Sequence, residues 1–398
     1  MSIIRPEKLK DSGSLKKLES LSRALGLSVN ELKEVKSLPL SKRYTEVKVP
    51  KIDGTFRIVY KPDYRLRKVQ RRINNRIFKE LVSWPYYLFG SVPSSPDDKK
   101  NGIKRDYVNC AKKHCNAKTI LKVDIKNFFD NIHRDLVEDI FKNFFKYKGE
   151  ALEYLVDLCC NGGYIVQGAL TSSYIATLCL YDIEFDIVKR AERKNLVYTR
   201  LVDDITISSK VSNFDFSQIK MHVEKMMLEK DLPLNLEKTK IHHISTEPLS
   251  VHGLRVSFDT PRLASDEVKR IRASLSNLIA LSKKNNSITS AAYRKEYDRC
   301  MGKVNKLGRV EHNKHPIFLN KLKNIRPLPS EKDACRALAN IHRLEVMYKN
   351  GNSAKYSYIR SFHLASYRLI ILSRTACFSR LVNSLRVRLK KIEPKLQN

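Results

Sequence analysis

The sequence predicts an α+β fold in which a small antiparallel sheet with packed helices is followed by an all-helical C-terminal part. Residues 44–60 alternate between apolar and polar side chains around Asp53-Gly54, which is typical of a β-hairpin. From residue 118 to residue 256, short β-like runs alternate with stretches of helical spacing. After about residue 264 the apolar residues keep a helical spacing to the end of the chain.

The N-terminal stretch predicts a pair of short helices. Apolar residues recur at helical spacing in "LESLSRALGLSVNELKEV", and the pattern breaks at Gly26. Ser28 is expected to cap the second helix, with Glu31 completing a capping box. We expect the two helices to pack together, and a helix-turn-helix that reads duplex DNA is the alternative interpretation.

Two further stretches divide the chain. Residues 91–106 are polar and rich in Pro, Ser and charge, which predicts a mobile loop. Pro327-Leu328-Pro329 predicts a break between two helical parts. The part that follows is strongly basic, and its helices are expected to bind RNA in preference to a partner helix or a membrane surface.

The charge of the chain narrows the class of partner. The 398 residues contain 76 Lys and Arg against 42 Asp and Glu, a formal net charge of +34 that is spread along the whole chain. Such an excess is self-repelling unless a polyanion offsets it, so nucleic acid is the expected partner. No apolar run reaches the ~18 residues of a membrane span. The start of the chain lacks an export signal, and the 8 cysteines are scattered, which predicts a cytoplasmic protein without a disulfide framework.

Three carboxylates interrupt β-like runs. Asp124 ends the run Ile120–Val123, and Asp203-Asp204 separates two apolar β-like segments. Strand interiors usually exclude aspartate, so the adjacent pair predicts the tip of a tight hairpin. Clustered carboxylates repel one another and need a cation, and an all-oxygen site favours Mg²⁺ shared with substrate phosphates. Two such ions would support phosphoryl transfer.

These carboxylates lie within ordered blocks that resemble the reverse transcriptases, especially the retron type and related defence-associated enzymes of bacteria. In chain order the blocks resemble the fingers and motifs A to E: "VPKIDGTFRIVYKPDYRLRKVQRRI", "LKVDIKNFFDNI", "GYIVQGALTSSYIATL", "YTRLVDDITIS", "LNLEKTK" and "VHGLRVS". The resemblance covers roughly residues 20–325 and implies a right-hand polymerase. The expected parts are an N-terminal helical segment (1–43), fingers (44–117), palm (118–256), helical thumb (257–326) and basic helical extension (327–398).

The resemblance implies catalytic roles for four residues. Asp124 and Asp203 are expected to bind both Mg²⁺ ions, for which Mn²⁺ is a possible substitute, and Asp204 to support the metal site. Lys238 is expected to protonate the pyrophosphate leaving group.

It also implies residues that bind dNTP and RNA. Phe129 is the expected steric gate against a ribose 2′-hydroxyl, and Gln167 and Gly168 the floor beside the incoming base. Lys51 and Arg57 flank the hairpin turn and are expected to reach the triphosphate, with solvated surface cations as the alternative. The expected RNA contacts are His114, His252 and the basic face of a thumb helix: Lys269, Arg270 and Arg272.

The sequence departs from the family pattern at four positions. Leu201 stands where motif C usually has an aromatic residue, and Val166 replaces the usual proline of motif B. Retron enzymes typically carry Asn-Ala-x-x-His before motif A and Val-Thr-Gly in motif E. Here Cys110 replaces that asparagine, with His114 retained, and His252 replaces the threonine.

The resulting hypothesis is an RNA-directed DNA polymerase that copies a dedicated non-coding RNA into DNA, with a role in antiphage defence. Its expected partners are the RNA template, the DNA product and its hybrid with RNA, dNTPs and an effector protein. One alternative is template-independent or protein-primed synthesis by the same site. The other is a scaffold that binds RNA without catalysis. The two classes differ in whether dNTPs are incorporated.

Overall fold

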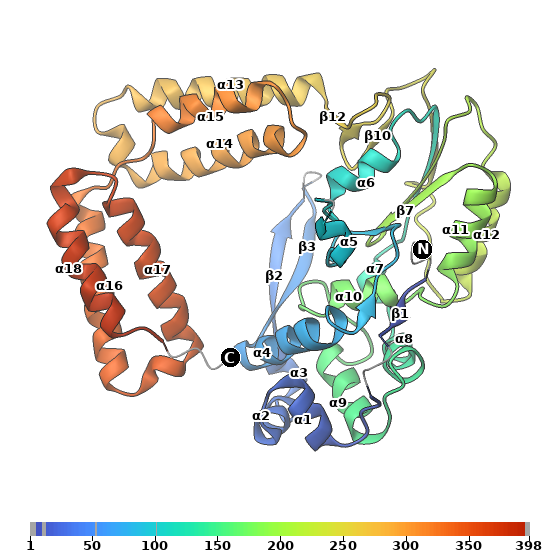
Figure 1. Cartoon of the computed structure of the whole chain (residues 1–398), viewed down its shortest axis with the longest axis horizontal. Helices are drawn as coiled ribbons and strands as arrows, with labels where there is room; N and C mark the ends of the chain where they lie inside the picture. Colours follow the sequence, from blue (N-terminus) through green and yellow to red (C-terminus); the bar gives the residue numbers. More distant parts are fainter. Residues whose placement is uncertain (1–4, 10–12, 52–53, 101, 395–398) are drawn as a thin grey trace. The chain divides into compact units, whose positions relative to one another are not determined.

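The computed structural model describes residues 5–9, 13–51, 54–100 and 102–394. The chain divides into two compact units, residues 1–262 and residues 263–398 (Figure 1). The first unit contains the predicted hairpin and sheet together with packed helices, and the second is helical. Among the described residues, no helix combines the length and the apolarity that crossing a bilayer requires.

The N-terminal helices form as the sequence predicts. They are α1 (Leu18–Leu25) and α2 (Val29–Lys36), and Ser28 and Glu31 complete the capping box of α2. The apolar faces of both helices are buried in the large core of the first unit, which also holds residues of α4 (Tyr64–Ile73) and α9 (Gly149–Cys159). The packed-pair interpretation is therefore confirmed.

The predicted hairpin is confirmed as β2 (Tyr44–Pro50) and β3 (Phe56–Pro62), paired antiparallel from Tyr44 opposite Pro62 to Pro50 opposite Phe56. Most of its side chains are exposed. The expected turn residue Asp53 lies outside the described residues, and Gly54 has a φ of +82°.

The central sheet, called the palm sheet here, has the strand order β5-β7-β8-β6-β9. Its strands are β5 (Leu88–Phe89), β6 (Thr119–Asp124), β7 (Val197–Leu201), β8 (Asp204–Ser209) and β9 (Lys240–His243). The last four pair antiparallel, as predicted, whereas β5 pairs parallel with β7. Because β5 has only two residues, its sequence contains no pattern from which the parallel pairing with β7 could be predicted.

The two faces of the palm sheet differ in chemistry. On one face, called the core face, Leu121, Val123, Ile205 and Ile207 are buried in the main core together with apolar residues of α11 (Glu184–Arg193) and α12 (Ser217–Leu228). The alternation of strand side chains puts polar residues on the opposite, polar face. These residues are Lys122, Asp124, Thr199, Asp204, Thr206 and Ser208.

Shorter elements complete the first unit. They are β1 (Glu7–Lys8), α3 (Leu40–Arg43), η1 (Asn74–Phe78), β4 (Val82–Ser83), α5 (Pro96–Lys100), α6 (Tyr107–Lys113), α7 (Phe128–Asn131), α8 (Arg134–Asp139), η2 (Ile140–Phe144), α10 (Ser172–Leu178), β10 (Ser250–Val251) and β11 (Leu254–Arg255), and β12 (Arg262–Leu263) lies at the unit boundary. The predicted loop 91–106 is wrong in part, because it contains α5 and a buried ion pair. Arg105 Nε lies 2.7 Å from Asp98 Oδ2.

The second unit consists of two groups of helices. The first is α13 (Ser265–Ser282), η3 (Ser287–Thr289), α14 (Ala291–Arg309) and α15 (Lys314–Asn324). The second is α16 (Glu331–Lys349), η4 (Asn352–Ala354), α17 (Tyr356–Leu372), η5 (Ala376–Phe378) and α18 (Ser379–Lys391), which share a core of their own. The predicted break at Pro327–Pro329 separates the two groups. Arg294 of α14 forms a two-pronged ion pair with Asp333 of α16 and joins them.

Candidate active site

The strand register places the predicted carboxylates beside one another. Asp124 ends β6 and lies opposite Asp204, the first residue of β8. Asp204 also pairs with Leu201, so Val202 and Asp203 form a two-residue turn between β7 and β8. The tight hairpin tip that the adjacent aspartates predict is therefore present, and its pairing with β6 brings the third carboxylate to the same end of the sheet.

The electrostatics of Asp203 reflect this crowding. Burial raises the pKa of its carboxyl, and the neighbouring carboxylates of Asp204 and Asp124 raise it further. A backbone hydrogen bond and the guanidinium of Arg57 lower it in part. Arg57 lies on β3 of the hairpin, so this strand contributes positive charge near the aspartates. The site favours the binding of additional cations.

Lys238 and Asn235 reach Asp124 from the segment before β9. Lys238 Nζ lies 3.1 Å from Asp124 Oδ2, and Asn235 Nδ2 donates to the same oxygen at 3.2 Å. The backbone N–H of Asn235 donates to the carbonyl of Asp124 at 2.8 Å. Lys238 was predicted from the sequence and Asn235 was not, although Asn235 stands in the same motif D block. Together they hold this segment against the end of β6.

The donor set fits Mg²⁺ in a particular way. In the described part of the chain, no three His, Cys, Asp or Glu side chains meet at metal-binding geometry. The three aspartates are therefore close without forming a finished cage, and Lys238 neutralises Asp124. Protein Mg²⁺ sites commonly use one or two carboxylates and take their other ligands from water and substrate phosphates. Oxygen-only donors at the end of the sheet match that pattern.

The motif B loop is docked against the hairpin. The N–H of Tyr60 on β3 donates to the carbonyl of Gln167 at 2.7 Å. Gly168 has a φ of +111°, and a Cβ there would lie 2.3 Å from the carbonyl oxygen of Tyr60. The close approach predicted at Gly168 was that of an incoming base. In the structure the backbone of β3 makes it, and this contact is what requires glycine.

The remaining residues expected to bind dNTP lie around this region. Phe128 is buried, whereas Phe129 is half-buried on α7 and packs against the edge of the core. Their adjacency on a helix explains why only one of the two rings is fully inside. Lys51 is exposed at the end of the hairpin, where its N–H donates to the carbonyl of Thr55. Of the two hairpin cations, Arg57 is the one that acts on the pKa of Asp203.

The expected RNA contact of His114 is wrong, because its side chain is fully buried. Its Nδ1 lies 2.7 Å from Ser208 Oγ and its Nε2 lies 2.7 Å from Thr199 Oγ1, so both ring nitrogens are occupied. Burial lowers the pKa of His114 to about 3, and His252 and Lys113 add to the effect. His114 is a neutral side chain that fixes the end of α6 to the polar face of the palm sheet.

The two departures from the retron pattern touch each other. His252 Nε2 lies 3.3 Å from Cys110 Sγ, and His252 Nδ1 lies 3.4 Å from Asp204 Oδ2. Cys110 in turn donates to Thr199 Oγ1, which also contacts His114. The side chain of His252 is 10% exposed, so little of it is available to RNA. A chain of side-chain contacts, which we call the polar-face chain, therefore runs Ser208–His114–Thr199–Cys110–His252–Asp204.

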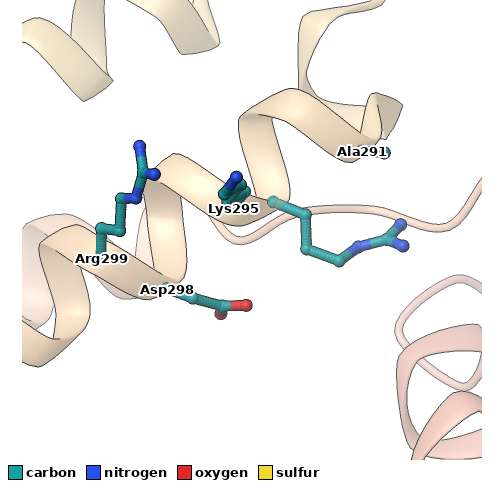
Figure 2. A pocket seen from close by; sticks show the side chains of 5 residues that line it. Ala291, Lys295, Asp298 and Arg299 are labelled. Carbon is teal, nitrogen blue, oxygen red and sulfur yellow. The ribbon is translucent and has the colours of Figure 1, made fainter. Parts of the chain in front are cut away.

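The expected thumb residues lie on α13 in the second unit. Lys269, Arg270 and Arg272 are exposed, and the opposite side of the helix buries Val268 and Ile271. The helix thus has the predicted apolar and basic faces. Further basic side chains lie on α14, where Lys295 and Arg299 extend from the helix near Asp298 (Figure 2).

Comparison with known proteins gives consistent results. A family model described as reverse transcriptase (RNA-dependent DNA polymerase) matches residues 49–272. The retron Ec48 reverse transcriptase of Escherichia coli is 57% identical over 97% of this chain and 94% of its own length. The retron Se72 reverse transcriptase of Salmonella heidelberg is 32% identical over 74% of this chain and 76% of its own length. A solved Candida albicans telomerase covers 91% of this chain and 68% of its own at 12% identity and a TM-score of 0.39, too low to add support.

Proposed function

Because this chain belongs to the reverse transcriptase family, and within it to the retron type, we propose that it copies a dedicated non-coding RNA into DNA by two-metal phosphoryl transfer. It is an RNA-directed DNA polymerase. The observation that carries the mechanism is the strand register that places Asp124 opposite Asp204, beside the turn that holds Asp203. Bound Mg²⁺ would activate the primer hydroxyl and stabilise the departing pyrophosphate.

The residues around the aspartates support the other steps of this proposal. Asp124 and Asp203 hold the cations, and Asp204 adds negative charge beside them. Arg57 is close enough to act on Asp203 and binds the triphosphate, with Lys51 nearer the tip of the hairpin. Lys238 Nζ lies 3.1 Å from Asp124, which supports its proposed role as the proton donor to the pyrophosphate leaving group.

Selection of the nucleotide falls to the groups beside this centre. Phe129 keeps part of its ring exposed five residues after Asp124 and excludes a ribose 2′-hydroxyl. Gln167 and Gly168 form the floor under the incoming base, held in place by Tyr60. The exposed cations Lys269, Arg270 and Arg272 follow the phosphates of the template–product hybrid.

The test begins with protein purified together with its bound nucleic acid. We expect a discrete RNA to copurify, and labelled dNTPs to be incorporated with Mg²⁺ only when that RNA is intact. Incorporation that survives RNase would identify template-independent or protein-primed synthesis. RNA without any incorporation would identify a scaffold.

A matched pair of variants tests the metal assignment. Asp203→Asn removes a carboxylate from the site and should lower incorporation at least ~1,000-fold, because that carboxylate is a proposed ligand of the catalytic Mg²⁺ ions. Asp186→Asn makes the same chemical change on the exposed side of α11 and serves as the control. Equal activity of the two variants would refute the assignment.

The biological part of the proposal is antiphage defence with a separate effector protein, supported by the resemblance to retron-type and defence-associated enzymes. We expect expression of the chain with its neighbouring genes to lower phage plating, and Asp203→Asn to remove the protection. Protection that persists in this variant would separate defence from DNA synthesis.

A further inference from the structure

The turn that carries Asp203 contains a residue in an unfavourable backbone conformation. Val202 has a φ of +61°, whereas Asp203 is not among the residues of positive φ. A two-residue hairpin turn with positive φ only at its first position follows the type II′ pattern, which favours glycine there. A β-branched residue adopts this conformation only when its surroundings hold it, at a cost of about 1–3 kcal/mol.

Arg200 provides a bond that holds this turn. Its side chain is fully buried on the core face of the palm sheet, and Nη1 donates to the carbonyl oxygen of Val202 at 3.1 Å. The other donors of the guanidinium are also used: Nε and Nη2 bind Glu184 at 2.6 and 2.7 Å, Nη1 binds the carbonyl of Ala176 at 3.1 Å, and Nη2 binds that of Thr177 at 2.7 Å. All five N–H groups of the fork therefore have acceptors.

A second contact holds the side chain of Val202. Gly90 follows β5, has a φ of +95°, and its N–H donates to the carbonyl of Arg105. A Cβ at Gly90 would lie 3.2 Å from Cγ2 of Val202 and 3.6 Å from Cγ of Leu201. Leu201, which stands where the family usually has an aromatic residue, and Val202 thus both lie against a residue with no side chain.

We propose that Arg200 is a positioning residue for DNA synthesis, which keeps Val202 at its positive φ and thereby aims the carboxylate of Asp203. Glu184 anchors the guanidinium, and Gly90 leaves room for the side chain of Val202. This inference rests on the proposed role of Asp203 in metal binding. It assigns the buried ion pair a task beyond stability, since an apolar pair of similar volume often serves the fold equally well.

The decisive experiment is a double-mutant cycle between residues 200 and 202. Arg200→Lys keeps a charge for Glu184, but its three donors on a compact ammonium cannot span Glu184, the two α10 carbonyls and Val202 together. Val202→Gly removes the conformational cost, since glycine adopts positive φ freely. We expect Arg200→Lys to lower kcat about tenfold with the KM for dNTP changed less than about threefold, and Val202→Gly to restore most of the loss in the double variant.

The same variants are titrated with Mn²⁺ in the absence of nucleic acid, with the free ion followed by electron paramagnetic resonance. We expect Arg200→Lys to bind Mn²⁺ several-fold more weakly than the parent. In the double variant the affinity for Mn²⁺ should return toward that of the parent. The control is Arg43→Lys. Arg43 is also buried, and it binds Asp157 and the carbonyls of Leu38 and Lys36, but it makes no contact with the turn. Any loss of kcat or of Mn²⁺ affinity in Arg43→Lys should remain when Val202→Gly is added.

A second variant covers the case in which Arg200→Lys unfolds. Gly90→Ala leaves the ion pair intact but strains the backbone at a φ of +95° and crowds Cγ2 of Val202. It should therefore lower kcat, and Val202→Gly should restore only the part of the loss that the crowding causes. Loss of activity that Val202→Gly never restores, or restores equally for Arg43→Lys, would overturn the inference. Equal activity of the parent and Asp203→Asn would instead overturn the proposed role of Asp203.

Discussion

On the core face of the palm sheet a charged pair reaches the turn that carries Asp203, and on the polar face a chain of polar side chains in mutual contact reaches Asp204. The core-face pair is Arg200 with Glu184, fully buried and fully hydrogen-bonded. The polar-face chain begins at Ser208, passes through His114, whose pKa is lowered to about 3 by burial, and reaches Asp204 through His252. The two adjacent aspartates therefore have different support: a buried ion pair bonds to the turn of Asp203, and a series of hydrogen-bonded side chains reaches Asp204.

The difference shows how each face tolerates loss of a partner. A buried ion pair is costly to break, because the remaining charge has no water to solvate it. Along the polar-face chain each side chain contacts the next through one or two atoms, and the loss of one such contact carries a smaller penalty. We therefore expect substitutions on the core face to threaten the fold, and those on the polar face to act more mildly.

The largest effect is expected for Arg200→Met, which strands Glu184 in the core. The free energy of unfolding should fall by about 3–5 kcal/mol, as for other broken buried pairs. Denaturant unfolding of the isolated protein measures this loss. Adding Glu184→Leu should recover most of it, because no charge is then left unpaired. A double variant as unstable as the single one would contradict this account of the core face.

A smaller, pH-dependent effect is expected for His114→Gln, with a loss of about 1–2 kcal/mol at pH 7.5 from poorer bonding to Thr199 and Ser208. The pKa of His114 is about 3 in the folded protein, and an unfolded histidine titrates near 6.5. Between these values the unfolded chain binds one more proton, so His114 costs stability as pH falls. The gap between parent and variant should therefore shrink by about 1 kcal/mol per unit below pH 6. Unfolding at several pH values measures the gap, and a pH-independent gap would show that His114 is not buried in its neutral form.

The smallest effect is expected for Cys110→Asn and His252→Thr, which restore the usual retron residues. Each should lower kcat about two- to threefold, with a coupling of about 0.5–1 kcal/mol in the double variant because the side chains touch. The coupling is obtained from the steady-state kcat of dNTP incorporation by the parent, the two single variants and the double variant. Cys115→Asn is the matched control, since the thiol of Cys115 donates to the carbonyl of Ala111 instead of His252. If Cys115→Asn coupled to His252→Thr as strongly as Cys110→Asn does, the contact between Cys110 and His252 would not be the cause of the coupling.

Local pattern was enough to predict much of the fold and the carboxylates of the site. The hairpin β2–β3, the capping box at Ser28, and the strand ends at Asp124 and Asp204 follow from alternation, turn chemistry and the exclusion of aspartate from strands. What could not be predicted depends on partners distant in sequence. β5 has two residues, and nothing in them shows a parallel pairing with β7.

The errors at the site have the same origin. His114 carries the residue type of an RNA contact, and only the packing of α6 on the sheet shows that it is buried. Arg200 was not singled out from the sequence, because its partner Glu184 lies 16 residues earlier and only the folded structure brings the two side chains together. Gly168 was correctly singled out for close approach, but the approaching group is Tyr60, from a strand more than a hundred residues away.

The contact between Tyr60 and Gln167 bears on how such enzymes are re-engineered. A hairpin transplanted from a relative must present a backbone N–H to residue 167 and a carbonyl over residue 168, or the graft will sit away from the sheet. The hairpin β2–β3 and the loop of Gln167 and Gly168 should therefore be exchanged together. Chimaeras that exchange both segments keep the backbone contacts of residue 60 with residues 167 and 168. Chimaeras that exchange only one segment have to form these contacts anew.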